Sequence, residues 1–183
     1  MITTDALRDQ PTLSGSRVRL EPLTSTVLED YLRALADPEV RRLTGTHGHV
    51  DRAQVADWLA TRPDQHDRAD WAIMGVDDGA FLGEAVLNEL DAHNASMNYR
   101  IFLAGPQHFG RGCGTEATRL VVDFALNTLA LHRVSLGVFA FNPRARHVYE
   151  KCGFIQEGRL RERLYWDGQW QDEILMSVLQ GEV

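Results

Sequence analysis

Between a predicted strand and a predicted helix lies a glycine-rich stretch, PheGlyArgGlyCysGlyThr, at residues 109–115. Its glycines allow a tight turn and a close approach to a ligand, because no Cβ stands in the way. Several backbone N–H groups then converge at the start of the helix, where the helix dipole favours an anion. The stretch predicts a cradle for a diphosphate, and its alternative is a simple turn.

Two common nucleotide-binding loops do not match this stretch. A Walker loop is excluded, because no GlyLysSer or GlyLysThr follows the glycines. A Rossmann site is disfavoured, because the GxGxxG spacing fails and three strands predicted to be antiparallel precede the loop.

Upstream of the loop, the sequence predicts one strand, two helices and three further strands. Thr26 and Glu29 form a capping-box pattern that starts the first helix, and Pro38 ends it. The second helix starts at Asp51 and ends before Pro63. The predicted strands cover residues 17–20, 71–76, 81–89 and 97–103.

Downstream of the loop, two helices alternate with strands. The first helix has an apolar face from Ala117 to Thr128, and the second begins at Asn142 and ends at Gly153. The predicted strands cover residues 133–140, 154–160 and 171–179. The order β-α-α-β-β-β-α-β-α-β-β predicts a mixed α/β fold, in which the strand–helix–strand unit implies a local parallel pair.

Length and composition predict one domain, residues 13–183, after a loose segment at 1–12. No apolar run is long enough for a transmembrane helix, and the polar N-terminus does not resemble a signal peptide. Cys113 and Cys152 are too few for a disulfide framework. We therefore expect a cytoplasmic protein with no membrane partner.

The acidic charge is unevenly distributed. The chain has 19 Lys and Arg against 26 Asp and Glu, a net charge of -7. Residues 1–100 hold 10 basic and 17 acidic side chains, whereas residues 101–183 hold nine of each. An acidic chain binds nucleic acid poorly, so we expect no such partner. The excess either attracts a cationic ligand or serves solubility.

A second segment, AsnProArgAlaArgHisValTyrGluLysCysGlyPhe at 142–154, adds to the glycine-rich loop. Together the two resemble the GNAT superfamily of acetyl-CoA-dependent N-acetyltransferases, in its RimJ/RimL-type branch. Gly112-Cys113-Gly114 match the Gly-x-Gly half of the family loop, whereas Phe109 stands where Gln or Arg is usual. The stretches at 17–24 and 159–176 resemble the same branch.

This resemblance implies a GNAT-like fold in which the strands at 97–103 and 133–140 splay apart around acetyl-CoA. Pantetheine would pair with the backbone of Phe102 and Leu103, and Asn142 would both cap its helix and contact the cofactor. The diphosphate would lie on the loop, with Arg111 adding a charge-assisted contact. The implied loop residues are Gly110, Arg111, Gly112, Cys113, Gly114 and Thr115. The family also implies a possible homodimer.

The expected chemistry requires one proton acceptor and one proton donor, because an amine attacks a thioester and a thiolate leaves. Tyr149 occupies the family position of the donor, and its alternative is a core aromatic. Asn98 stands where a Glu is common in the GNAT family, and its amide cannot accept a proton. The remaining bases are Glu84, Glu89 and Glu162, or a water relay. Glu84 is slightly preferred, and its alternative is an exposed strand carboxylate.

Two function classes follow. The first is an N-acetyltransferase that uses direct transfer in a ternary complex, with a protein N-terminal amine, a polyamine or an amine-bearing antibiotic as acceptor. The second is a non-catalytic acyl-CoA-binding or sensor module, which Asn98 favours. No metal is expected, because His47 and His49 lack a third ligand. Trp166 and Trp170 are expected to serve packing, and their alternatives are an acceptor mouth or a dimer surface.

Overall fold

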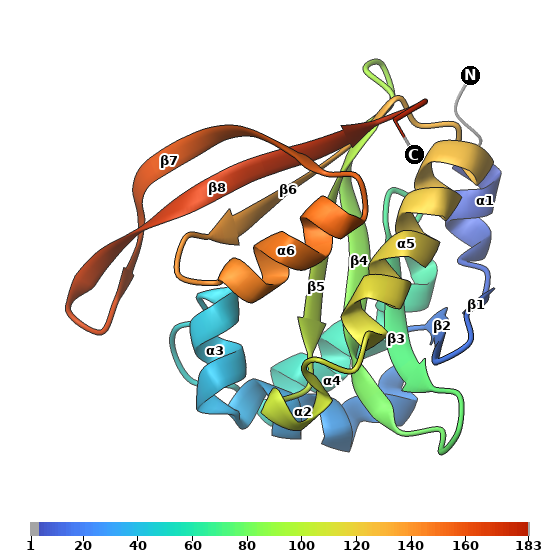
Figure 1. Cartoon of the computed structure of the whole chain (residues 1–183). Coiled ribbons are helices and arrows are strands. Elements are labelled where there is room, and N and C mark those ends of the chain that lie inside the picture. The colour runs from blue at the N-terminus through green and yellow to red at the C-terminus, as the bar shows by residue number, and fades with distance from the viewer. Residues whose placement is uncertain (1–3, 183) are drawn as a thin grey trace.

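In a computed structural model, which describes residues 4–182, the chain forms an eight-stranded mixed sheet with helices on both faces (Figure 1). This confirms the mixed α/β prediction. The strands are β1 (Leu13–Ser14), β2 (Val18–Pro22), β3 (Ala69–Gly75), β4 (Phe81–Asp91), β5 (Ser96–Leu103), β6 (Arg133–Phe139), β7 (Ile155–Trp166) and β8 (Gln169–Leu179). The helices are α1 (Thr4–Asp9), α2 (Leu28–Ala36), α3 (Pro38–Thr44), α4 (Arg52–Ala60), α5 (Cys113–Asp123) and α6 (Pro143–Lys151). Across the described residues, every helix is too short or too polar to cross a membrane.

The sheet has the order β1-β2-β3-β4-β5-β6-β8-β7 and opens at its centre. β5 and β6 form a parallel pair, and all the other neighbouring strands are antiparallel. Their pairing joins residues 96–98 to residues 133–135, and within the described chain it extends no further. Residues 99–103 of β5 therefore keep β4 as a partner but face a gap on the β6 side. The splayed strands expected from the sequence are confirmed.

Two hydrophobic cores lie on opposite faces of the sheet. The α5-side core packs α5 and α6 against the sheet and includes Trp71 and Tyr99. The α2-side core packs α2 and α4 against the other face and includes Tyr31 and Leu59. Because side chains alternate along a strand, Tyr99 contacts the α5-side core and Phe102 contacts the α2-side core. The alternation along β5 thus sends side chains from the open strand to both faces.

Of the N-terminal segment expected to be loose, residues 1–3 lie outside the described residues, whereas the part from Thr4 onward is structured, which differs from the expectation. Thr4–Asp9 forms α1, and Leu7 is buried in the α5-side core. Gln10 is also buried and donates a hydrogen bond from its side chain to the Arg62 carbonyl at 3.3 Å. One apolar anchor on a six-residue helix is too short a pattern to show periodicity, which is why the sequence did not reveal it.

The region around the first two helices differs from the prediction at two points. The capping box of Thr26 and Glu29 is wrong: Thr24 accepts from the Thr26 amide and starts a 3-10 turn, and Glu29 pairs with Arg52. Pro38 follows α2 as expected but also begins α3. Asp37 caps that helix, because its side chain accepts from two backbone amides at 2.8 and 3.0 Å.

Two later elements are also longer or more irregular than predicted. α5 continues into a π-helical turn, η4 (Phe124–Thr128), which buries Leu126 and leaves Thr128 exposed. The strands β7 and β8 extend to a two-residue hairpin turn, Asp167-Gly168, with φ of 48° and 77°. Positive φ at both positions suits the tight twist of such hairpins, so the strands continue where a longer loop was predicted.

Gly83 lies where β4 bulges against β3. Its φ is +150°, and an added Cβ would lie 2.0 Å from the Phe102 carbonyl oxygen. Gly83→Ala is expected to lower the free energy of unfolding by about 3 kcal/mol, because backbone atoms of β5 must move. The matched control is Gly79→Ala, where φ is +66° but no atom lies within 4 Å, with an expected loss of about 1 kcal/mol. Urea unfolding measures both losses. An equal loss of unfolding free energy in the two variants would contradict a clash between the added Cβ and the backbone of β5.

Candidate functional site

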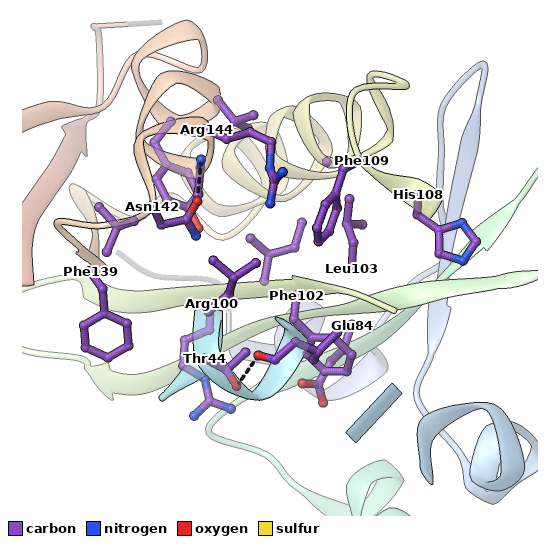
Figure 2. Close-up of a pocket in the computed structure, with 18 of the residues that line it drawn as sticks. Thr44, Glu84, Arg100, Phe102, Leu103, His108, Phe109, Phe139, Asn142 and Arg144 are labelled. Carbon is purple, nitrogen blue, oxygen red and sulfur yellow. Dashed lines mark hydrogen bonds between the residues drawn. The ribbon is translucent and has the colours of Figure 1, made fainter. Parts of the chain in front are cut away.

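A cavity of about 620 Å³ occupies the gap where β5 and β6 separate. Its lining comes from both faces of the sheet (Figure 2). On one face, α2 and α3 contribute Tyr31, Val40 and Thr44; on the other, α6 contributes Val148 and Tyr149. The cavity is therefore lined from both faces of the sheet, and we call it the passage.

The glycine-rich loop forms one wall of this passage. Gly110 and Gly112 have φ of 73° and 81°, a backbone conformation that strongly favours glycine. Gly112 is the N-cap of α5, and no side chain in the described chain caps this end. The first N–H groups of a helix have no partners inside it, so they are free to bind an anion.

The loop residues predicted to bind the cofactor separate into two groups. Gly110, Gly112, Gly114 and Thr115 line the cavity. Arg111 is exposed and Cys113 is buried in the α5-side core, and neither is part of the lining.

The open edge of β5 forms a second wall. Phe102 and Leu103 both line the cavity, and their backbones pair with Glu84 and Gly83 of β4 on the closed side. An extended chain of amides, such as pantetheine, fits the unpaired side as an added strand. Asn142 also lines the cavity, and its Oδ1 accepts from the Ala145 amide at 3.1 Å. Its expected capping role is confirmed, and the cofactor contact stays a prediction.

Tyr149 reaches the passage from the α5-side face. Its side chain is largely buried, and its ring packs edge-on against Phe154 at 5.9 Å. Burial raises the pKa of Tyr149 above its ordinary value. The phenol therefore stays protonated at neutral pH and carries a proton that it can donate.

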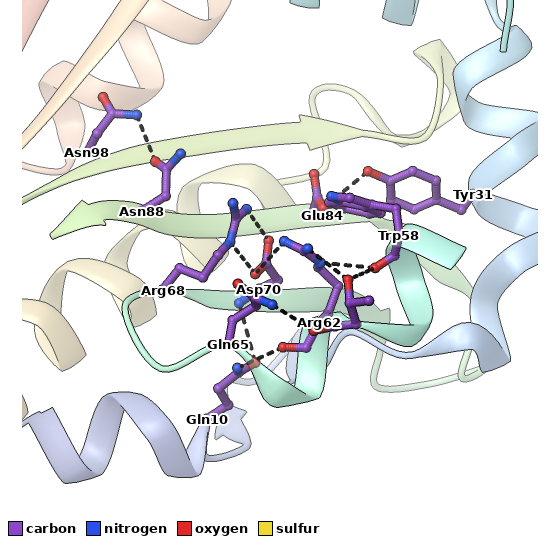
Figure 3. Close-up of polar contacts among 11 residues, drawn as sticks. Gln10, Tyr31, Trp58, Arg62, Gln65, Arg68, Asp70, Glu84, Asn88 and Asn98 are labelled. Atoms are coloured by element: carbon purple, nitrogen blue, oxygen red, sulfur yellow. Dashed lines mark hydrogen bonds and ion pairs between the residues drawn. The ribbon is translucent and has the colours of Figure 1, made fainter. Parts of the chain in front are cut away.

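Glu84 reaches the passage from the opposite face. Its side chain is 4% exposed, and its Oε1 accepts a hydrogen bond from the Tyr31 hydroxyl at 3.1 Å (Figure 3). Burial and the nearby charge of Asp70 raise the pKa of Glu84 to about 7, although Arg100 opposes the shift. A carboxyl with this pKa can accept a proton near neutral pH and release it again.

Asp70 belongs to a buried ionic cluster beside Glu84 that the sequence analysis missed (Figure 3). The side chain of Asp70 is fully buried and accepts two hydrogen bonds from Arg68, at 2.7 and 2.6 Å. Arg62 lies 4.0 Å from the same carboxylate. Register places Asp70 two residues along β3 from the partner of Glu84, so both carboxylates lie on the same face. In the sequence, the signal for this cluster is the charged pattern ArgAlaAsp at residues 68–70, at the start of a buried strand.

The other predicted bases do not line the cavity. Glu89 and Glu162 have φ of 56° and 53°, so each lies at an irregular point of its strand, and both side chains are exposed. Asn98 donates a hydrogen bond to the Asn88 side chain at 3.1 Å. Of the three carboxylates considered, the structure brings Glu84 alone to the passage.

The remaining residues considered for function lie elsewhere. His47 packs on Trp166 at 4.8 Å, whereas Trp170 is 59% exposed and packs against Tyr165 at 5.0 Å. In the described chain, no group of three or more His, Cys, Asp or Glu gathers as metal ligands would. The lining also includes Arg100, Arg144 and Glu173, which the sequence analysis did not single out.

Known proteins resemble this chain in sequence over most of its length. Residues 17–155 match the family model described as "Acetyltransferase (GNAT) domain". A spermidine N(1)-acetyltransferase of Vibrio cholerae is 34% identical over 119 residues, which is 64% of this chain and 68% of that protein. A putative ribosomal N-acetyltransferase of Bacillus subtilis, YdaF, is 32% identical over 105 residues, or 57% of each chain.

A solved structure shares the fold. The spermidine N-acetyltransferase from Vibrio cholerae in complex with CoA and spermine superimposes with a TM-score of 0.82. The likeness covers 92% of this chain and 98% of that chain, at 23% sequence identity.

Proposed function

Because this chain belongs to the acetyltransferase (GNAT) family and is an N-acetyltransferase, we propose that it transfers the acetyl group of acetyl-CoA to a primary amine of a small, cationic acceptor. The observation that carries this proposal is the passage between β5 and β6, which Tyr149 and Glu84 line from opposite faces. The two substrates then meet in a ternary complex. This arrangement favours an enzyme over the non-catalytic binding module.

Acetyl-CoA would lie with its diphosphate at the N-terminus of α5 and its pantetheine along Phe102 and Leu103. Support comes from the uncapped helix end and from the strand edge that faces the gap. The N–H groups between Gly110 and Thr115 supply the donors. Assignment to the RimJ/RimL-type branch and the expected homodimer stay predictions.

In the transfer step, the amine nitrogen bonds to the acetyl carbon and the carbon–sulfur bond breaks. The Glu84 carboxylate takes the proton that the acceptor ammonium must lose before it attacks, and the Tyr149 hydroxyl protonates the leaving thiolate. The nitrogen loses its second proton as the amide forms, and this proton restores the Tyr149 hydroxyl. Glu84 releases its own proton to solvent. Both groups lie on the walls of the passage. The pKa of Glu84, raised to about 7, suits the role of base near neutral pH, and Tyr149 holds its proton at that pH.

A polyamine is the acceptor class that we favour among the three considered. Glu84 and Glu173 both line the passage, and Glu173 lies so close to Gly137 that an added Cβ there would be 2.2 Å from its Oε1. The spermidine N(1)-acetyltransferases among the relatives give independent support.

A thiol-release assay over an amine panel tests the proposal. We expect acetyl-CoA turnover with spermidine and spermine, and much slower turnover with an aminoglycoside or with peptides that carry a free N-terminus. Activity with peptides alone would overturn the acceptor class. An absence of thiol release with every amine, at confirmed folding, would overturn the enzymatic proposal for these acceptors.

A further inference from the structure

Arg144 lies in the first turn of α6, at the end of the passage where the glycine-rich loop begins. Its Cζ lies 3.8 Å from the centroid of the Phe109 ring. Figure 2 shows the guanidinium and the ring side by side between α6 and the loop before α5, and both side chains line the cavity. A cation above an aromatic face is held in place by the ring quadrupole. The stacking therefore restrains Arg144 at the cofactor end of the passage.

This guanidinium also keeps its full charge available. In the described chain, Arg144 forms no ion pair with a carboxylate within 4.0 Å. Glu39 of α3, whose pKa is lowered mainly by Arg42 and also by the charge of Arg144, is already held by two hydrogen bonds from Arg42, each 2.8 Å long. Glu150, on the same helix, is paired with Arg146 at 2.9 Å. Arg144 is thus an unneutralised cation beside the uncapped N-terminus of α5.

We infer that Arg144 binds the diphosphate of CoA from the side opposite the α5 amides, with Phe109 holding its guanidinium in position. The inference rests on the proposed function, because it assigns a further residue to the same cofactor. A guanidinium presents several donors in a planar fork, which matches two phosphate oxygens better than an ammonium does. Backbone amides from α5 and the fork from α6 then enclose the anion from two elements.

Calorimetric titration of three ligands into full-length variants tests this assignment. The ligands are CoA, dephospho-CoA, which lacks the 3′-phosphate, and pantetheine, which lacks all phosphates. Arg144→Ala is expected to weaken binding of CoA and of dephospho-CoA by about 10- to 100-fold, the range for a lost charge-assisted contact. The affinity for pantetheine is expected to stay unchanged. The CoA affinity of Arg144→Lys is expected to lie between those of the wild type and the alanine variant.

The matched control is Arg146→Ala, which removes an exposed arginine of the same helix that does not line the cavity. Equal CoA affinity in Arg144→Ala and Arg146→Ala would overturn the inference while leaving the proposed function intact. A loss for CoA without a loss for dephospho-CoA would place Arg144 on the 3′-phosphate and overturn the diphosphate assignment. An equal loss of affinity for pantetheine would indicate that the substitution distorts the passage, and this result would also overturn the diphosphate assignment. Failure of the wild-type chain to bind any CoA derivative would instead refute the proposed function.

Discussion

Tyr149→Phe is expected to lower kcat by about 10²- to 10⁴-fold, the usual contribution of a positioned proton donor. The substitution removes the hydroxyl of a residue that lines the passage and leaves the ring that packs against Phe154. Because the ring contributes the packing, the free energy of unfolding and the Kd for acetyl-CoA are expected to change little. Steady-state thiol release gives kcat, and calorimetry gives the affinity.

The control for this prediction is Tyr165→Phe, which removes a hydroxyl from a tyrosine that is 51% exposed on the β7–β8 hairpin. It is expected to keep the wild-type kcat. Since burial raises the pKa of Tyr149, the wild-type enzyme should also keep its activity up to pH values above the usual range for tyrosine ionisation. A wild-type kcat in Tyr149→Phe would remove this residue from the mechanism.

Glu84→Gln is expected to lower kcat/KM by about 10²-fold or more near pH 8, because an amide cannot accept the ammonium proton. Wild-type kcat/KM should rise with pH through about 7, where Glu84 loses its proton. This rise should be absent in the variant. Glu89→Gln is the matched control, because Glu89 lies on the same strand but does not line the cavity. An unchanged pH profile in Glu84→Gln would contradict the role of Glu84 as base.

The same substitution is expected to stabilise the fold at high pH. The pKa of Glu84 is about 7 in the folded state against 4.5 for the ordinary side chain. The folded state therefore binds more protons between these pH values, and stability falls as pH rises from about 4.5 to about 7. Gln removes this titration, so its advantage over Glu should be about 3 kcal/mol larger at pH 8 than at pH 4. Urea unfolding at both pH values measures the difference, and a difference near zero would show that Glu84 is not held in a charge-disfavouring site.

Much of the fold could be predicted because its signals are local. Turn residues and alternating apolar positions give the order of elements, and the Asn142 cap and the glycine loop mark two helix starts. Pro38 shows the limit of such signals, since a proline ends one helix and also suits the first turn of another. The π-helical turn after Asp123 is set by packing of Leu126, which no local pattern could show.

The candidate site was predictable to a smaller extent, because it is assembled across strands. Glu84, Glu89 and Glu162 look equivalent along the chain, and β-sheet register with the packing of Tyr31 distinguishes Glu84. Asp70 affects the pKa of Glu84 from a neighbouring strand, so its influence has no counterpart in the linear sequence. The stacking of Arg144 on Phe109 likewise joins two motifs that are 35 positions apart.

The opening between β5 and β6 also bears on the kinetics. Since the lining of the opening comes from both faces of the sheet, we expect donor and acceptor to approach the reacting atoms from opposite faces. We therefore expect either substrate to bind the free enzyme first, and CoA and the acetylated product to leave independently. Double-reciprocal initial-rate plots for the two substrates are then expected to intersect. Each product is expected to compete with the substrate that shares its binding site and not with the other substrate.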